Sequence, residues 1–435
     1  MNSNLNLTGD YQAGDLAPRM KRFGLILAVL GLGAGAAMGL TGDADTKTHF
    51  WFAYLVAFCF ALSIGLGALF FTIVGHVVNT HWNISLRRIA ELTMSSLPVV
   101  CLFGLGMLLP FFDHDVEIWQ WDSMTGAESH AVEHAGEHGV GAQALSDQLD
   151  HAEHQHIVSK KAAYLNRNGF IFRLFAYFLI WAWMARFFLG KSAAQDTAGD
   201  SIDNVLSMKK VAAPMILVFA LTASFASFDL IMSLDETWFS TIFGVYFFAG
   251  SFLAANCWLV IASKWLQAQG KMTDVINKEH YHDLGKWMFA FTFFWGYIAF
   301  SQFMLIWYAN IPEETHFYMF RFNETWQGWS NALLFAGFLF PFVALLSRHV
   351  KRSTNVLRVM AFYVLAMHYL DLYWLIMPNF HRGEVIDNPF GLVEIALLVG
   401  FVGLFIFGVA RNAGKQSLLP VNDPLLGKCL GHKNL

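Results

Sequence analysis

Residues 224–250 read SFASFDLIMSLDETWFSTIFGVYFFAG and contain two apolar runs joined by a short polar turn. The first run carries Asp229 before its end, Asp235 and Glu236 mark the turn, and the chain is apolar again from Trp238 onward. An ionisable side chain in an apolar run is costly unless it has a partner, a water-filled cavity or a proton. The stretch therefore predicts two membrane spans and a carboxylate with a specific role.

The whole chain has the composition of an integral membrane protein. Of its 435 residues, 56% are hydrophobic and only 14% are charged, and the mean hydropathy is +0.45. A soluble domain carries about 25% charged residues. The net charge of −4 gives no basis for binding nucleic acid.

Ten apolar runs are long enough to cross a bilayer as helices, which takes about 20 residues each. The runs do not alternate between apolar and polar residues, as the strands of a membrane β-barrel would. We therefore predict an all-α integral membrane protein with ten transmembrane helices. The spans are expected at about 23–40, 50–78, 89–112, 169–190, 211–233, 239–263, 285–309, 328–347, 355–377 and 390–410.

The distribution of positive charge predicts the orientation of the chain. With the N-terminus in the cytoplasm, the cytoplasmic loops and tails would hold 21 of the 28 Lys and Arg residues. Such an excess is typical of cytoplasmic loops, so both termini are expected in the cytoplasm. The predicted organisation is a cytoplasmic segment at 1–22, spans one to three at 23–112, an external loop at 113–168, spans four to ten at 169–410 and a cytoplasmic tail at 411–435.

The cysteine and histidine patterns argue against a redox centre in this chain. None of the four cysteines forms a C-x-x-C pair, so an Fe–S cluster or an attached haem c is not expected. Only His76 and His368 lie clearly inside spans, which is too few for a dihaem protein. Nucleotide-binding and H-E-x-x-H motifs are absent from the sequence. Any electron transfer would have to pass through other subunits.

The external loop is rich in histidine and holds seven of the 17 in the chain. In SHAVEHAGEHG three histidines are spaced at i, i+4 and i+8, which could bind zinc or copper on a helix face. Acidic residues are interleaved with these histidines and an apolar face is lacking. The favoured interpretation is therefore a solvated loop that faces a partner and binds no metal. The histidines are His114, His130, His134, His138, His151, His154 and His156.

Ionisable residues within the spans are the candidate site, because such residues mark pathways or pairs in membranes. His368 and Asp371 are three residues apart and share a helix face. With the predicted orientation, the outer half holds Asp229, Asp235, His368, Asp371 and Glu394, together with Arg173, and the inner half holds His76, Glu91 and Lys264. Apart from Arg173, we predict these residues to form a proton pathway; a catalytic residue or a cofactor-binding residue is not assigned.

Three stretches resemble the membrane subunits of the polysulfide reductase, NrfD-like family. They are ASFDLIMSLDETWFSTIFGVYFFAGSF at 226–252, FSQFMLIWYANIPEETHFY at 300–318 and HYLDLYWLIMPNF at 368–380. The chain is most similar to the second quinone-binding subunits of alternative complex III, a quinol:cytochrome c oxidoreductase of bacterial inner membranes. The similarity extends over all ten spans in order.

The resemblance implies a fold of two four-helix bundles, spans 2–5 and 6–9, with one flanking helix on each side. It implies a respiratory complex with haem c subunits, an Fe–S subunit and a sister NrfD-like subunit. A terminal oxidase that accepts the electrons could join this complex, and lipids would surround it. Quinol or menaquinol would be oxidised near the outer face, and the resemblance leaves open whether this chain or only the sister binds it. This subunit would help proton translocation. Bundle one would contain His76, Glu91, Arg173 and Asp229, and bundle two Lys264, His368 and Asp371.

Two other classes of function remain open from the sequence. A stand-alone secondary transporter also has about ten spans and buried acids, but usually has broken helices and inverted repeats. A purely structural scaffold would satisfy its buried acids through neighbouring groups. Association with haem-containing subunits would separate the first interpretation from the transporter, and mutation of Asp229 and Asp371 would separate it from the scaffold.

Overall fold

The computed structural model describes residues 9–126, 156–199, 201–381 and 390–434. Every regular element in these ranges is a helix. In chain order the elements are α1 (Leu16–Gly39), α2 (Ala44–Val77), α3 (Ile84–Met94), α4 (Leu97–Gly104), η1 (Leu105–Phe112), α5 (Gln120–Gly126), α7 (Arg167–Gln195), α8 (Asp203–Leu230), η2 (Met232–Leu234), α9 (Phe243–Ala268), α10 (Lys278–Ala309), α11 (Pro312–Arg321), α12 (Gln327–Ala332), η3 (Leu333–Leu339), α13 (Phe340–Leu346), α14 (Arg348–Arg352), α15 (Thr354–Ile376), α16 (Pro378–His381), α17 (Leu392–Ala413) and α18 (Leu426–Leu430).

Ten helical segments of the described residues are long and apolar enough to cross a membrane, which confirms the predicted number of spans and the all-α class. Several helices begin earlier than the apolar runs. The fifth span starts at Asp203 and the seventh at Lys278, well before 211 and 285. Hydropathy marks only the part of a helix that lies in hydrocarbon, while the helix itself continues into the polar interface.

Two spans are irregular near prolines. The third span is divided into α3, α4 and the 3-10 helix η1, with Pro98 near the start of α4 and Pro110 inside η1. The eighth contains the π-helix η3 immediately before Pro341. Proline lacks the N–H that the preceding turn would use, so the backbone changes its hydrogen-bond pattern there.

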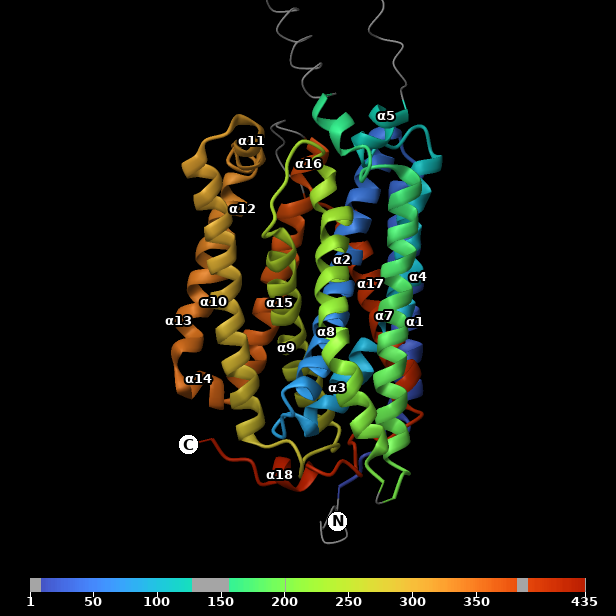
Figure 1. Ribbon diagram of the computed structural model, residues 1–435, viewed down its shortest axis with the longest axis vertical. Coiled ribbons are helices and arrows are strands. Elements are labelled where there is room, and N and C mark those ends of the chain that lie inside the picture. Colours follow the sequence, from blue (N-terminus) through green and yellow to red (C-terminus); the bar gives the residue numbers. More distant parts are fainter. Residues whose placement is uncertain (1–8, 127–155, 200, 382–389, 435) are drawn as a thin grey trace, which may run out of the picture.

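Both ends of the described chain lie at the same end of the helix bundle (Figure 1). We call this the terminal end; it also carries α14 and α18, whereas α5, α11 and α16 lie at the opposite loop end. The two ends of the chain are joined there, because Leu418 N donates to Tyr11 O at 2.7 Å. Tyr11 also donates through its hydroxyl to Asp274 in the loop before α10.

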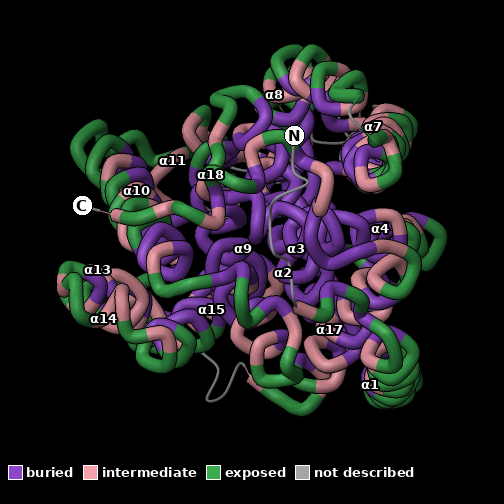
Figure 2. The backbone as a smooth tube through the Cα atoms, turned by 90° about the horizontal axis from the view of Figure 1, so that it is seen from below, coloured by how far each residue is buried: buried purple, intermediate pink, exposed green. Residues whose placement is uncertain are grey.

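The centre of the bundle is formed by α2 and α9. Within the 18-residue apolar window of each span, 94% of the residues of α2 and 78% of those of α9 are buried, compared with 17% of those of the eighth span. Helix α2 packs against α3, α7 and α8, and α9 packs against α10 and α15 as well as against α2 itself. Figure 2, which views the bundle from its terminal end, shows α2, α3 and α9 buried and the outer sides of α1, α7 and α13 exposed.

Helix α1 lies along α17 at the edge of the bundle, and glycines bring the two backbones together. A Cβ atom on Gly31 would lie 2.3 Å from Gly400 N and 2.6 Å from Ala396 O. A Cβ atom on Gly403 would meet Ala28 N at 2.3 Å. Small residues are the usual means by which membrane helices approach closely, because lipid offers helices little hydrophobic drive to associate.

We expect Gly31→Leu to separate α1 from α17 and to lower the free energy of unfolding by about 1–3 kcal/mol, the usual cost of overpacking. Chemical unfolding of the purified chain in detergent would measure the change. Gly33→Leu is the matched control, since a Cβ atom there has no neighbour within 4 Å. Equal stability of the two variants would contradict the packing role of Gly31.

Candidate functional site

Asp371 of α15 is a buried carboxyl that faces hydrogen-bond donors and, among the described residues, makes no ion pair. The side chain is 3% exposed. The Tyr246 hydroxyl of α9 donates to Oδ1, and Trp295 Nε1 of α10 donates to Oδ2 at 3.2 Å. Neutral donors stabilise a buried carboxylate less than a cation does. Asp371 is therefore a buried carboxyl held by two neutral donors and by no cation among the described residues.

His368, one turn earlier on α15, is hydrogen-bonded to the central helix α2. Its Nε2 lies 2.9 Å from Ser63 Oγ of α2, and the Ser63 hydroxyl itself donates to Phe60 O at 2.8 Å. When the serine hydroxyl donates to Phe60 O, the hydrogen on His368 Nε2 is the donor in their contact. Nδ1 of His368 is then the unprotonated nitrogen and can accept a proton.

His368 and Asp371 both line a small cavity, which also borders Gly250, Trp295 and Gly337. Its volume is about 20 Å³, and one water molecule needs roughly 10–15 Å³ of such space. A Cβ atom on Gly250 would come within 3.1 Å of His368 Nδ1. The absent side chain of Gly250 thus leaves Nδ1 accessible.

Asp229, the carboxylate that the sequence singles out, lies in a different environment. Arg173 of α7 donates to both of its oxygens, Nη2 to Oδ1 at 2.8 Å and Nε to Oδ2 at 2.9 Å. The Tyr177 hydroxyl also donates to Oδ2, at 2.9 Å. The guanidinium carbon of Arg173 lies 3.9 Å from the centre of the Tyr164 ring. Asp229 therefore has the partner that a buried carboxylate requires, and the bidentate pair ties α7 to α8.

Glu91 is also paired with cations, at the terminal end. It lies between two arginines of its own helix, with Oε2 2.9 Å from Arg88 Nε and Oε1 3.3 Å from Arg87 Nε. Arg88 also pairs with Asp196 after α7 at 2.9 Å, and Arg87 with Asp423 of the C-terminal tail at 2.5 Å. Glu91 itself is fully buried. The network joins α3, α7 and the tail.

The other candidates within the spans lie apart from Asp371. Glu394 accepts from Gly391 N at 2.9 Å, as a capping residue of α17, and lies 2.9 Å from His49 Nε2. The ring of His76 stacks on Phe188, and its buried Nε2 has no hydrogen-bond partner among the described residues. Lys264 donates to Thr354 Oγ1 at 3.3 Å.

At the loop end, Asp235 anchors α11. His316 Nε2 lies 2.7 Å from Asp235 Oδ2, and Trp238 N donates to Oδ1 at 3.1 Å. Burial lowers the pKa of His316, but its hydrogen bond to Asp235 and the charge of that carboxylate outweigh burial and raise the pKa above 6.5. The contact joins α11 to the turn between the fifth and sixth spans.

This raised pKa predicts a pH dependence of stability. A histidine whose pKa is higher in the folded state adds stability below pH 6.5, and this stability is lost as the pH rises through the folded-state pKa. Between pH 6 and pH 9 we expect the wild-type chain to lose up to about 1 kcal/mol more unfolding free energy than His316→Gln. Equal losses in the two proteins would contradict the pairing.

Arg321 of α11 is a buried cation that holds α11 against the end of α15. Its guanidinium donates to Phe317 O at 2.7 Å and to Leu375 O at 2.8 Å, and lies 3.5 Å from the Phe317 ring centre. Burial lowers the pKa of Arg321 to about 9. The positive charge meets the negative end of the α15 dipole, just beyond Asp371.

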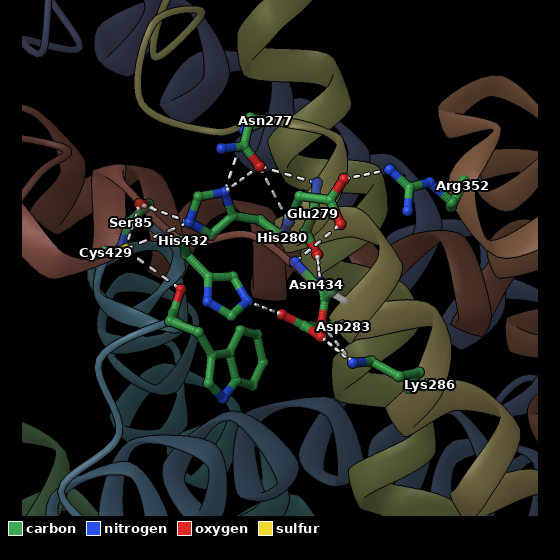
Figure 3. Close-up of polar contacts among 11 residues, drawn as sticks. Ser85, Asn277, Glu279, His280, Asp283, Lys286, Arg352, Cys429, His432 and Asn434 are labelled. Atoms are coloured by element: carbon green, nitrogen blue, oxygen red, sulfur yellow. Dashed lines mark hydrogen bonds and ion pairs between the residues drawn. The ribbon is translucent and has the colours of Figure 1, made fainter.

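The C-terminal tail docks at the terminal end through a polar cluster (Figure 3). His280 Nε2 lies 3.3 Å from Cys429 Sγ, and His280 Nδ1 lies 3.0 Å from Asn277 Oδ1. The order thiol, imidazole and amide is that of a cysteine nucleophile with its base and orienting group. However, Cys429 is fully buried and burial raises the pKa of its thiol, which opposes formation of the nucleophilic thiolate. The cluster is therefore a docking contact.

The predicted histidine-rich loop is only partly described. His130, His134, His138, His151 and His154 lie outside the described residues, while His114 and His156 are exposed. Within the described ranges, no group of three or more His, Cys, Asp or Glu side chains is placed to hold a metal ion.

The sequence analysis named Asp371 and His368, but it did not single out Trp295, Arg321 or Arg88. Trp295 was an ordinary aromatic in a span, and Arg321 was counted only as a loop cation. A single arginine within the aromatic run HFYMFRF is the signal that could have identified Arg321. Arg88 was likewise counted only toward the cytoplasmic charge.

Within the described residues, the chain has ten helical segments able to cross a membrane and, in Asp371, a buried carboxyl without an ion pair that shares a small cavity with a histidine. No protein-family model matches the chain, and no curated protein matches it in a sequence comparison.

Proposed function

We propose that the chain is a membrane subunit of a bacterial respiratory quinol:cytochrome c oxidoreductase of the alternative complex III type, and that it transfers protons. The observation that carries the proposal is the buried carboxyl of Asp371, which has neutral donors from Tyr246 and Trp295 and shares a cavity with His368. An intramembrane ionisable group without a compensating charge is best explained by a functional role.

The geometry suggests how a proton would move. A proton released by Asp371 can reach His368 Nδ1 through a single water in the cavity between them. Protonation at Nδ1 would make His368 a cation whose Nε2 stays hydrogen-bonded to Ser63 Oγ. Ser63 belongs to the central helix α2, so the proton held on His368 lies between α15 and the middle of the molecule.

The NrfD-like arrangement would group spans two to five in one bundle and spans six to nine in a second. Contacts exist within each set, through α2, α3, α7 and α8 and through α9, α10, α13 and α15, and α2 packs against α9 where the two sets meet. The first span pairs with the last, as expected for flanking helices. In this arrangement the proton site belongs to bundle two, whereas Asp229 and Glu91 stabilise bundle one as ion pairs.

In the proposed complex this chain carries no redox centre. Electrons from quinol or menaquinol would pass through Fe–S and haem c subunits, and the sister NrfD-like subunit would be the main quinol site. Both termini and the positively charged loops would face the cytoplasm. The ion-paired acids of bundle one favour a scaffold role for this bundle. This would be a second function of the chain, alongside proton transfer in bundle two.

The first experiment is to purify the tagged chain from its native membrane in mild detergent and to record a reduced-minus-oxidised spectrum with quinol. The tag needs a flexible linker, because Cys429 and His432 of the tail contact the bundle. We expect co-purifying c-type haem that quinol reduces. A colourless protein without partners would contradict the proposal and favour a stand-alone transporter.

A further inference from the structure

An apolar groove of about 510 Å³ opens at the terminal end between α1, α3, α9, α15 and α17. We propose that it is a binding site for an anionic phospholipid, with the acyl chains in the groove and the phosphate between Arg19 and Arg358. The site is separate from the Asp371 cavity and does not depend on the function proposed above.

The walls of the groove suit acyl chains. They are formed mainly by large apolar side chains, among them Phe23 of α1, Ile261 and Trp265 of α9, Phe362 of α15 and Ile406 of α17. All these residues lie in the part of their helices nearest the terminal end. The groove therefore lies at the depth of one membrane leaflet and begins near its headgroups.

The charges at the groove suit a phosphate. Arg19 of α1 and Arg358 of α15 both line it and both are exposed. Neither arginine forms an ion pair with a described residue. Guanidinium groups bind phosphate oxygens through paired N–H donors, and basic pockets between membrane helices on the cytoplasmic side are typical sites for anionic headgroups.

An isoprenoid quinone fits the groove less well, because its neutral ring oxygens would leave Arg19 and Arg358 without a net counter-charge. The hydroxyl that lines the groove is that of Thr93, and it already donates to Ile89 O at 2.7 Å. It also accepts from Trp258 Nε1, at 3.0 Å, so the indole donor of Trp258 is used as well. A neutral phospholipid would leave the two arginines without a net counter-charge. The anionic phospholipid satisfies both the walls and the charges.

Native mass spectrometry of the full-length purified chain can test the site with phosphatidylglycerol and phosphatidylcholine of identical acyl chains. Each arginine near an anionic lipid is worth about 1 kcal/mol, or roughly fivefold in affinity. We therefore expect the chain to prefer phosphatidylglycerol about thirtyfold. Arg19→Gln and Arg358→Gln should each reduce the preference about fivefold, and the double variant should abolish it.

Two further variants separate the site from general effects. Ala262→Trp places a large side chain in the groove and should abolish retention of both lipids, with an unchanged elution volume. Arg186→Gln, an exposed arginine of α7 outside the groove, should leave the preference unchanged. The proposal is overturned by a wild-type preference near one, by a preference that survives in the double variant, or by displacement of phosphatidylglycerol with an equal concentration of menaquinone.

Discussion

Replacing Arg88 with Met is expected to destabilise the chain by about 3–5 kcal/mol, the usual cost of removing one partner from a buried ion pair. Arg88 is fully buried and pairs with Glu91 and Asp196. It also donates to Ser417 O at 2.9 Å and to Ser192 O at 3.1 Å. The variant would leave Asp196 without its cation and two carbonyls without their donor. Unfolding of the purified protein by denaturant in detergent would measure the loss.

The variants that accompany Arg88→Met identify the cause. Adding Asp196→Asn removes the uncompensated charge, so the double variant should recover part of the lost stability. Arg186→Met, at an exposed position on α7, should change stability by no more than about 0.5 kcal/mol. If Arg88→Met were as stable as Arg186→Met, the network at the terminal end would not hold α3, α7 and the tail together.

Asp371→Asn is expected to reduce proton transfer by at least about 100-fold, the lower range for loss of a positioned proton-transfer group. Asparagine keeps the shape of the side chain and an acceptor for Tyr246, but it cannot carry the proton. The measurement is the rate of proton release beyond the one proton per electron that quinol oxidation itself liberates, by the purified complex in liposomes driven by quinol. Stability should fall only modestly, because the replacement is nearly isosteric.

Asp229→Asn is the matched control for this prediction. It neutralises a carboxylate at a similar position near the loop end, but one that is held by Arg173 and Tyr177. We expect it to lower stability and to leave proton release per electron unchanged. Normal proton release in Asp371→Asn would contradict the prediction. Loss of proton release in Asp229→Asn alone would indicate a proton path in bundle one.

Much of the architecture could be predicted from local pattern. Each predicted run overlaps one of the ten apolar helices, because the free energy of placing a residue in lipid is largely a property of that residue and its near neighbours. The helix ends were less well predicted, since Asp203 and Lys278 are polar and still lie in the first turn of long helices. Polar residues continue a helix freely once it has left the hydrocarbon.

The sequence by itself determined the class of the protein, the number of its spans and the short set of ionisable groups within them. It singled out Asp229 and placed Asp371 in the same predicted proton pathway, two acids near the ends of two apolar helices. Only the tertiary structure separated them, by placing Arg173 against the first and a cavity with His368 beside the second. The physical reason is that burial of a charge has a local cost, whereas its compensation comes from other helices, whose rotation and depth are set by packing across the whole bundle.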